Sequence, residues 1–205
     1  MSDLNNDIYY TIDSPCEGIF RDKGSKFIAY AFPFNQEDKL KDIIAHCKSL
    51  HPKARHHCWA YRLSPDREVY RINDDGEPSG TAGRPILNEL LSSNLTDIMV
   101  VVVRYFGGTL LGVPGLINAY KNATQDCILN ADIVEKTIDE VFEIFFQYPN
   151  MNDVMRLIKD YDWKIIEQQF EIDCRIRVAI RQSEVKFLKD RFKDLIDIKY
   201  SPIEG

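Results

Sequence analysis

The sequence predicts an α+β protein with two domains, residues 1–131 and 132–205, each a β-sheet packed by helices. Short segments in which apolar and polar residues alternate, as in strands, recur along the chain. Between them lie segments whose apolar residues repeat every three or four positions, as in helices. After Asp132 the composition changes, and the rest of the chain follows the order strand, helix, strand, strand, helix, strand. That order is the split βαβ, ferredoxin-like βαββαβ plan.

The first domain combines short strands with three helices. The expected strands are residues 8–10 and 16–20, paired in an antiparallel meander, then 27–32, 54–63, 68–72 and 98–103. The first expected helix has Asn35 as its N-cap and stops at His51, and the second covers residues 85–91. The third has Pro114 in its first turn, where a missing N–H costs nothing, and buries Tyr120 on its apolar face.

In the second domain, the expected strands are residues 137–148, 163–170, 172–180 and 196–200, and the expected helices are residues 151–161 and 183–192. The third strand carries the row Arg175, Arg177 and Arg181. Two interpretations stay open for this row. It binds RNA phosphates on an exposed sheet face, or nearby carboxylates such as Glu167 neutralise it in cross-strand pairs.

Candidate functional side chains are most concentrated in the acidic loop DDGEPSGTAGRP, residues 74–85. Asp74, Asp75 and Glu77 place three carboxylates among glycines that can adopt positive φ and prolines that fix φ. A flexible linker needs neither the charges nor the prolines, so the segment is interpreted as a folded surface loop with a function. Either the carboxylates supply an acid and a base or ligands for magnesium, or they bind loop amides and pair with Arg84 or Arg104.

A glycine-rich turn follows the apolar run IMVVVV, residues 98–103. The run is expected to end at Arg104 and Tyr105, and Gly107 and Gly108 then lead into the third helix. A buried strand, a glycine turn and a helix N-terminus together present backbone N–H groups to an anion. The glycines equally permit close packing on the sheet, and the established phosphate-binding spacings are absent from the sequence.

The histidines and cysteines predict no metal site. In KARHHCWAYRL the alternation of a strand sends His56 and His57 to opposite faces, so they do not chelate one metal together. His57 is a candidate proton carrier or hydrogen-bond donor beside the acidic loop, and a structural histidine is the other interpretation. The five cysteines form no CxxC pair, which favours reduced thiols that pack as small apolar residues.

The charge balance opposes general adhesion to nucleic acid. With 26 basic and 32 acidic side chains, the formal charge is −6, although a local basic face is compatible with it. The sequence has no apolar run of membrane-spanning length and no signal-peptide pattern in its first ten residues. The expected location is the cytoplasm, without membrane contact.

The motifs DDGEPSGTAGRP and VVVRYFGGTLLGVPGLINAY, with RHHCWAYRL upstream, resemble the IMPACT/YigZ family over roughly the first two thirds of the chain. Pro114 stands where the family usually has glycine. The resemblance implies a first domain similar to domain IV of elongation factor G, with a ribosomal-protein-like fold, and a second similar to its ferredoxin-like domain V. Family members are regulators linked to translation, and those elongation-factor domains contact ribosomal RNA and protein.

The sequence therefore predicts a non-enzymatic binding protein linked to regulation of translation, which contacts the ribosome, RNA or a translation-associated protein. The alternative is a hydrolase that uses Asp75 and Glu77 on a phosphoester or peptide bond, although no serine elbow or metal box accompanies them. A small anion at the glycine turn is a third hypothesis. No catalytic residue, cofactor or metal is predicted. The predicted binding residues are His57, Asp74, Asp75, Glu77, Arg84, Arg104, Tyr105, Gly107, Gly108 and Lys121.

Overall fold

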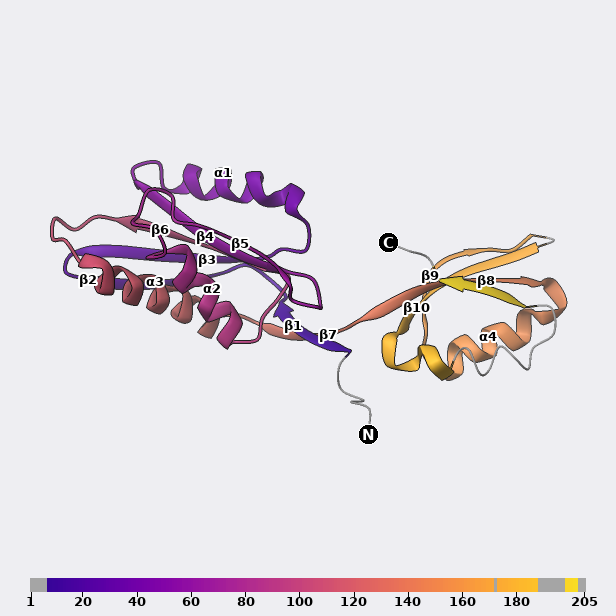
Figure 1. Ribbon diagram of the computed structural model, residues 1–205. Helices are drawn as coiled ribbons and strands as arrows, with labels where there is room; N and C mark the ends of the chain where they lie inside the picture. Colours follow the sequence, from indigo (N-terminus) through magenta and orange to yellow (C-terminus); the bar gives the residue numbers. More distant parts are fainter. Residues whose placement is uncertain (1–6, 172, 188–197, 203–205) are drawn as a thin grey trace, which may run out of the picture. The chain divides into compact units, whose positions relative to one another are not determined.

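The protein is a mixed α/β molecule of two compact units, seen in a computed structural model that describes residues 7–171, 173–187 and 198–202 (Figure 1). One unit is Tyr9–Lys136, and the other combines Thr137–Gly205 with Met1–Ile8. Among the described residues, no helix is both long enough and apolar enough to span a bilayer.

The unit Tyr9–Lys136 is built on a five-stranded antiparallel sheet in the order β2-β3-β6-β4-β5. Its strands are β2 (Cys16–Asp22), β3 (Ser25–Pro33), β4 (His56–Leu63), β5 (Val69–Asn73) and β6 (Ile98–Tyr105). The apolar run of the sequence is the central strand β6, and it is buried from Ile98 to Arg104. A continuous β-branched run suits a strand that is covered on both faces.

Helices cover both faces of this sheet (Figure 1). Helix α1 (Leu40–Leu50) packs on one face, in a core with Val101 and Val103. Helices α2 (Gly83–Ser92) and α3 (Gly112–Leu129) pack on the other, in a core with Val100 and Val102. Alternate residues of β6 therefore belong to two different cores.

Three details differ from the sequence-based expectation. The strand β1 (Ile8–Ile12) pairs with β7 (Ile133–Thr137) in a separate two-stranded sheet, so it does not join a meander with β2. Helix α1 is preceded by the 3₁₀ turn η1 (Glu37–Lys39), whose N-cap position is Gln36 without a side-chain cap bond, so Asn35 is not the cap. Strand β6 continues through Arg104 and Tyr105, because Arg104 still pairs with strands on both sides.

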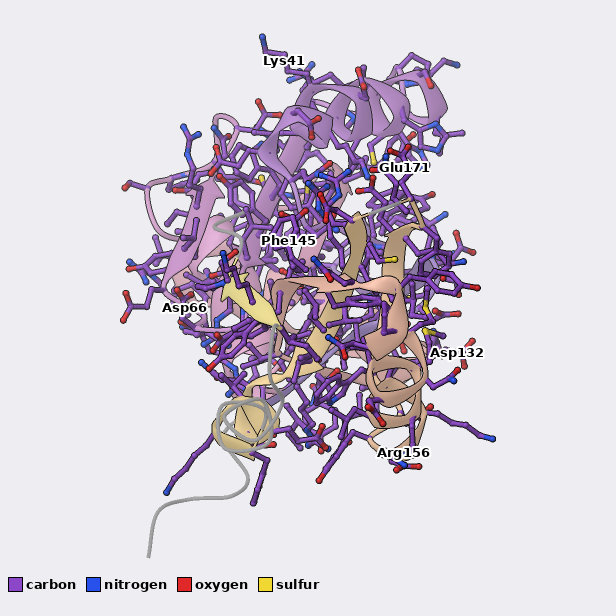
Figure 2. All side chains as sticks on the ribbon, turned by 90° about the vertical axis from the view of Figure 1, so that its right-hand side faces the viewer. Lys41, Asp66, Asp132, Phe145, Arg156 and Glu171 are labelled. Carbon is purple, nitrogen blue, oxygen red and sulfur yellow. The ribbon has the colours of Figure 1, made fainter. Side chains whose placement is uncertain are left out.

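The second unit has a four-stranded antiparallel sheet in the order β11-β8-β10-β9. Its described elements are β8 (Asp139–Gln147), η2 (Tyr148–Asn150), α4 (Met151–Asp160), β9 (Lys164–Gln169), β10 (Asp173–Arg181), η3 (Gln182–Glu184) and β11 (Lys199–Pro202). Val154 and Ile158 of α4 pack into the core of this unit. Arg156, on the same helix, points outward, as Lys41 does on α1 of the other unit (Figure 2). The helix predicted at 183–192 lies partly outside the described residues, as do residues 196–197 of the last predicted strand.

Candidate functional site

Asp74 organises the acidic loop by accepting hydrogen bonds from three backbone amides. One carboxylate oxygen accepts the N–H groups of Ala82 and Gly83, at 3.0 and 2.8 Å, and the other accepts that of Gly80 at 2.9 Å. Because α2 begins at Gly83, Asp74 satisfies amides that the first turn of a helix leaves without an intrahelical partner. The carboxylate caps α2 and closes the loop at the same time.

Asp75 connects the loop to β4. Its carboxylate accepts the His57 N–H at 2.7 Å, and its carbonyl oxygen lies 2.9 Å from Nδ1 of His56. Asp75 and Gly76 both have positive φ, 41° and 86°, which explains a glycine at the second position of this tight turn. The two histidine rings belong to opposite faces of the sheet, because His57 pairs with Val103 and His56 with Arg104.

His57 behaves as a buried neutral side chain. Burial lowers the pKa of its imidazole, while the carboxylate of Asp75, 4.0 Å from Nδ1, acts in the opposite direction. His51, on the same face of the sheet, bridges two tyrosines: its ring nitrogens lie 2.9 Å from the Tyr105 hydroxyl and 2.7 Å from the Tyr30 hydroxyl. These contacts give His51, His57 and Tyr105 structural roles on the α1 face.

Glu77 lies at the centre of a buried polar cluster on the other face. Its Oε1 atom lies 2.6 Å from Nη1 of Arg104 and accepts a hydrogen bond of 2.8 Å from the Tyr120 hydroxyl. Glu77 and Arg104 are only 8% and 6% exposed, and Tyr120 is fully buried. Removing either charge would leave the other without its ionic partner in a region that excludes water.

Aromatic rings enclose the arginine of this cluster. The guanidinium carbon of Arg104 lies 5.4 Å from the ring centroid of Phe27 and 5.7 Å from that of Phe106, within the range of cation–π contacts. The edge-to-face pair of Phe27 and Tyr120, 5.1 Å between centroids, packs beside it. Strand β6, helix α3 and the acidic loop are thus joined through one charged group.

Cys58 and Tyr120 stay protonated in this environment. The Cys58 thiol lies 2.9 Å from the Asp74 carbonyl oxygen and 3.3 Å from the Tyr120 hydroxyl. Burial is the largest cause that raises the pKa of both groups. Neither provides an ionised nucleophile, and all three loop carboxylates are occupied by internal partners. The described residues contain no group of three His, Cys, Asp or Glu side chains placed to hold a metal ion.

The glycine turn contains one glycine required by packing and one that is open to solvent. A Cβ atom on Gly107 would lie 1.9 Å from the carbonyl carbon of Gly24. The backbone N–H of Gly107 donates a hydrogen bond of 3.1 Å to Ser25 Oγ. Gly108 has φ of 87°, and an added Cβ there would meet nothing within 4 Å. The packing interpretation therefore accounts for Gly107.

The ten predicted binding residues do not form one cluster. Asp74, Asp75 and Glu77 share the loop, and Arg104 meets Glu77; the hydroxyl of Tyr105 is bound on the opposite face of the sheet. Lys121 is an exposed residue of α3 whose Nζ lies 3.9 Å from Glu89 of α2. Arg84 is exposed on α2.

Sequence reasoning missed an exposed apolar surface beside the buried cluster. Phe106, Leu110, Val113 and Ile117 are 53%, 83%, 52% and 40% exposed; together with Gly108 they form the glycine-turn surface. Spacing alone does not reveal this surface, since Val113 and Ile117 lie on the same face of α3 as the buried Leu116 and Tyr120, and that position predicts burial. The polar role of Tyr120 could be predicted from its place on the apolar face of the helix, because a buried tyrosine hydroxyl needs a hydrogen-bond partner.

In the second unit, the arginine row is neutralised by carboxylates. Arg177 lies 2.8 Å from a carboxylate oxygen of Glu143 and 2.7 Å from one of Glu167, on the two neighbouring strands. Arg175 lies 3.4 Å from the same two glutamates, and Arg181 binds Asp7 at 2.7 Å. Of the two interpretations of this row, the cross-strand pairs are the ones observed.

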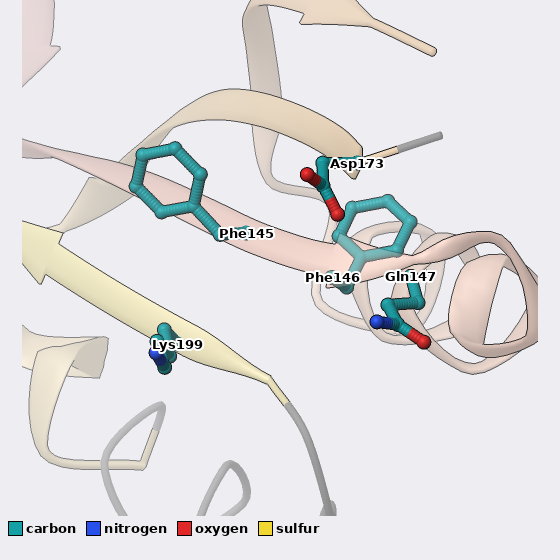
Figure 3. Close-up of a pocket in the computed structure, with 5 residues that line it drawn as sticks. All are labelled: Phe145, Phe146, Gln147, Asp173 and Lys199. Carbon is teal, nitrogen blue, oxygen red and sulfur yellow. The ribbon is translucent and has the colours of Figure 1, made fainter. Parts of the chain in front are cut away.

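The second unit also has an open pocket of about 640 Å³ on its sheet (Figure 3). It is lined by Phe145, Phe146, Gln147, Asp173 and Lys199. None of the predicted binding residues lines it.

Comparison with known proteins places these features in a family. The family model described as the Impact N-terminal domain matches residues 23–128, which include both the acidic loop and the glycine turn. An IMPACT family member of Haemophilus influenzae is 34% identical over 80% of this chain and 81% of its own length. The IMPACT family member YigZ of Escherichia coli is 32% identical, over 84% and 85%. A crystal structure described as that of a hypothetical protein is 28% identical, covers 97% of this chain and 98% of its own, and superposes with a TM-score of 0.73. The chain belongs to the IMPACT family.

Proposed function

We propose that this protein is a cytoplasmic, non-enzymatic binding protein linked to regulation of translation, and that the glycine-turn surface is its contact site. The observation that carries the proposal is the pairing of Glu77 with Arg104 and Tyr120 beneath a surface of exposed apolar side chains. The charged groups stabilise the turn from inside, and the apolar side chains face solvent. Such an arrangement suits recognition better than proton transfer.

The chemistry of the surface favours a protein partner over RNA. Arg104, which would be the natural phosphate ligand, is buried and neutralised by Glu77. Most of the exposed side chains at the turn are apolar, with Thr109 as a polar exception, and an exposed apolar patch on a soluble protein marks a protein contact more often than a phosphate contact. A ribosomal protein or a translation-associated factor is therefore the proposed partner.

The fold is consistent with this proposal. The strand order β11-β8-β10-β9 supports the ferredoxin-like interpretation of the second unit. The likeness to domains IV and V of elongation factor G remains part of the proposal, because a fold alone does not define a function. A link to translation is what the resemblance to the family implies, and this chain carries the motifs of the family.

Co-sedimentation with ribosomes tests the proposed contact. Leu110→Asp places a charge in the most exposed position of the surface, and Leu129→Asp, at the far end of α3 and 78% exposed, is the matched control. We expect the wild type and Leu129→Asp to pellet with ribosomes that keep their associated factors, and at least tenfold less Leu110→Asp to pellet. Equal recovery of all three proteins would contradict the proposal.

Two further arms of the experiment separate the rival functions. Binding that persists on protein-free ribosomal RNA and weakens steeply with salt would identify RNA as the partner. Turnover of phosphoester or dipeptide substrates, with or without magnesium, would identify the hydrolase. We expect neither result.

A further inference from the structure

Cys16 on β2 and Cys127 on α3 are neighbours in space although 111 positions separate them. Their sulfur atoms lie 3.7 Å apart. The sulfur of each residue also lies 3.4 Å from the backbone carbonyl oxygen of the other, so the two residues lie side by side. A disulfide bond is about 2 Å long, so the two sulfur atoms are in van der Waals contact and must come closer by about 1.7 Å to form one.

Two hydrogen bonds next to the pair hold β2 against α3. The Ile19 N–H donates to the Asp126 carboxylate at 2.7 Å, and the Asn130 side-chain amide donates to the Glu17 carbonyl at 2.9 Å. Between these bonds the two backbones touch, since a Cβ on Gly18 would lie 2.2 Å from the Cys127 nitrogen. The elements that carry the thiols are therefore held against each other before any bond forms.

We propose that Cys16 and Cys127 are a redox modification site, at which a small-molecule disulfide such as glutathione disulfide converts the two thiols into an intramolecular disulfide. Cys16 is partly exposed and Cys127 is buried, so Cys16 meets the oxidant. Its thiolate attacks one sulfur of glutathione disulfide, which forms a mixed disulfide and releases one glutathione thiolate. The Cys127 thiolate then attacks the Cys16 sulfur and releases the second.

Glutathione disulfide is the only co-reactant that the two thiols need. Two cysteine thiols are oxidised, one glutathione disulfide is reduced to two glutathione molecules, and the two thiol protons pass to the two glutathione thiolates. Because burial raises the pKa of both cysteines, and the thiolate is the attacking form, bond formation is slow at neutral pH and accelerates as the pH rises.

The new bond would connect the edge strand β2 to the helix that carries part of the glycine-turn surface. It would close a covalent ring containing the acidic loop and the glycine turn. A crosslink over so long a loop restricts the unfolded chain strongly, so the oxidised protein should resist unfolding. This inference is independent of the proposed function, because it rests only on the packing of β2 against α3.

Peptide mapping of the native protein tests the inference. The reduced protein is incubated in buffers of increasing glutathione disulfide to glutathione ratio, quenched with acid, alkylated and digested without reductant. We expect a linked peptide that contains Cys16 and Cys127, loss of two alkylatable thiols, and a higher urea midpoint that dithiothreitol reverses. Cys16→Ser and Cys127→Ser should each abolish the link, whereas Cys174→Ala, in the other unit, should leave it intact.

Two results would overturn the inference. One is a persistent glutathione adduct on Cys16 without closure onto Cys127, and the other is a linked peptide that forms only after urea is added. Circular dichroism checks that the variants fold. If Cys127→Ser does not fold, Cys16→Ser still provides the control, because its side chain is partly exposed.

Discussion

At Glu77, one carboxylate oxygen receives both a guanidinium N–H and a tyrosine hydroxyl in a site that excludes water. Such a group is costly to disturb, because its partners cannot turn to solvent instead. The sequence already offered Arg104 as a partner for the acidic loop, but it offered Arg84 equally, and only the fold decides between them. Local spacing cannot show which arginine faces inward.

Replacing Glu77 with glutamine should destabilise the Tyr9–Lys136 unit by about 3 kcal/mol, because Arg104 would lose its ionic partner while buried. Tyr120→Phe removes the hydrogen bond to Glu77 and the weaker contact with the Cys58 thiol but no charge, so it should cost only about 1 kcal/mol. Urea unfolding followed by tryptophan fluorescence measures both changes. If Glu77→Gln were as stable as the wild type, the Glu77–Arg104 pair would have no role in stabilising the turn.

Among the elements, those with a clear period were predictable and those defined by remote partners were not. The run at β6 and the apolar face of α3 follow from residue type and spacing. The pairing of β1 with β7 joins distant segments, and nothing local in either strand indicates it. Strand β6 also continues beyond its apolar residues, because the backbone of Arg104 pairs with both β3 and β4 and that of Tyr105 pairs with β3.

The start of α2 depends on a residue nine positions upstream of Gly83. Asp74→Ala should destabilise the protein by about 2 kcal/mol, because the amides of Gly80, Ala82 and Gly83 lose their acceptor. Asp74→Asn keeps one acceptor oxygen and should lose less. Hydrogen exchange detects the local effect: these three amides should exchange faster in Asp74→Ala, and unchanged rates would show that the carboxylate does not cap the helix.

At the scale of the whole molecule, the beginning of the chain contributes to the unit that contains its end. Asp7 lies in this unit and is 3% exposed. Its carboxylate accepts hydrogen bonds of 2.7 and 2.9 Å from Arg181 and one of 3.2 Å from the Ser183 N–H. A domain limit drawn from composition alone, such as 132–205, leaves this residue out.

The hydrogen bond from Arg181 is the largest cause that lowers the pKa of Asp7, from 3.8 to about 2. A carboxyl group with a lowered native pKa stabilises the folded protein above pH 3.8 and loses that contribution as the pH falls toward 2. Since Arg181 is partly exposed, we expect Asp7→Asn to cost about 1 kcal/mol at pH 7 and almost nothing at pH 2. Urea unfolding of the second unit at both pH values measures this; equal losses would contradict the ionic origin.

The central claim is that the glycine-turn surface binds a partner while the carboxylates beneath it stabilise the turn. Hydroxyl-radical footprinting of the protein, free and bound to ribosomes, tests it most directly because it reports on exposed side chains. We predict that labelling of Phe106 and Leu110 falls at least fivefold on binding and that labelling of Leu129 stays constant. Unchanged labelling of Phe106 and Leu110 in the bound protein would contradict the account.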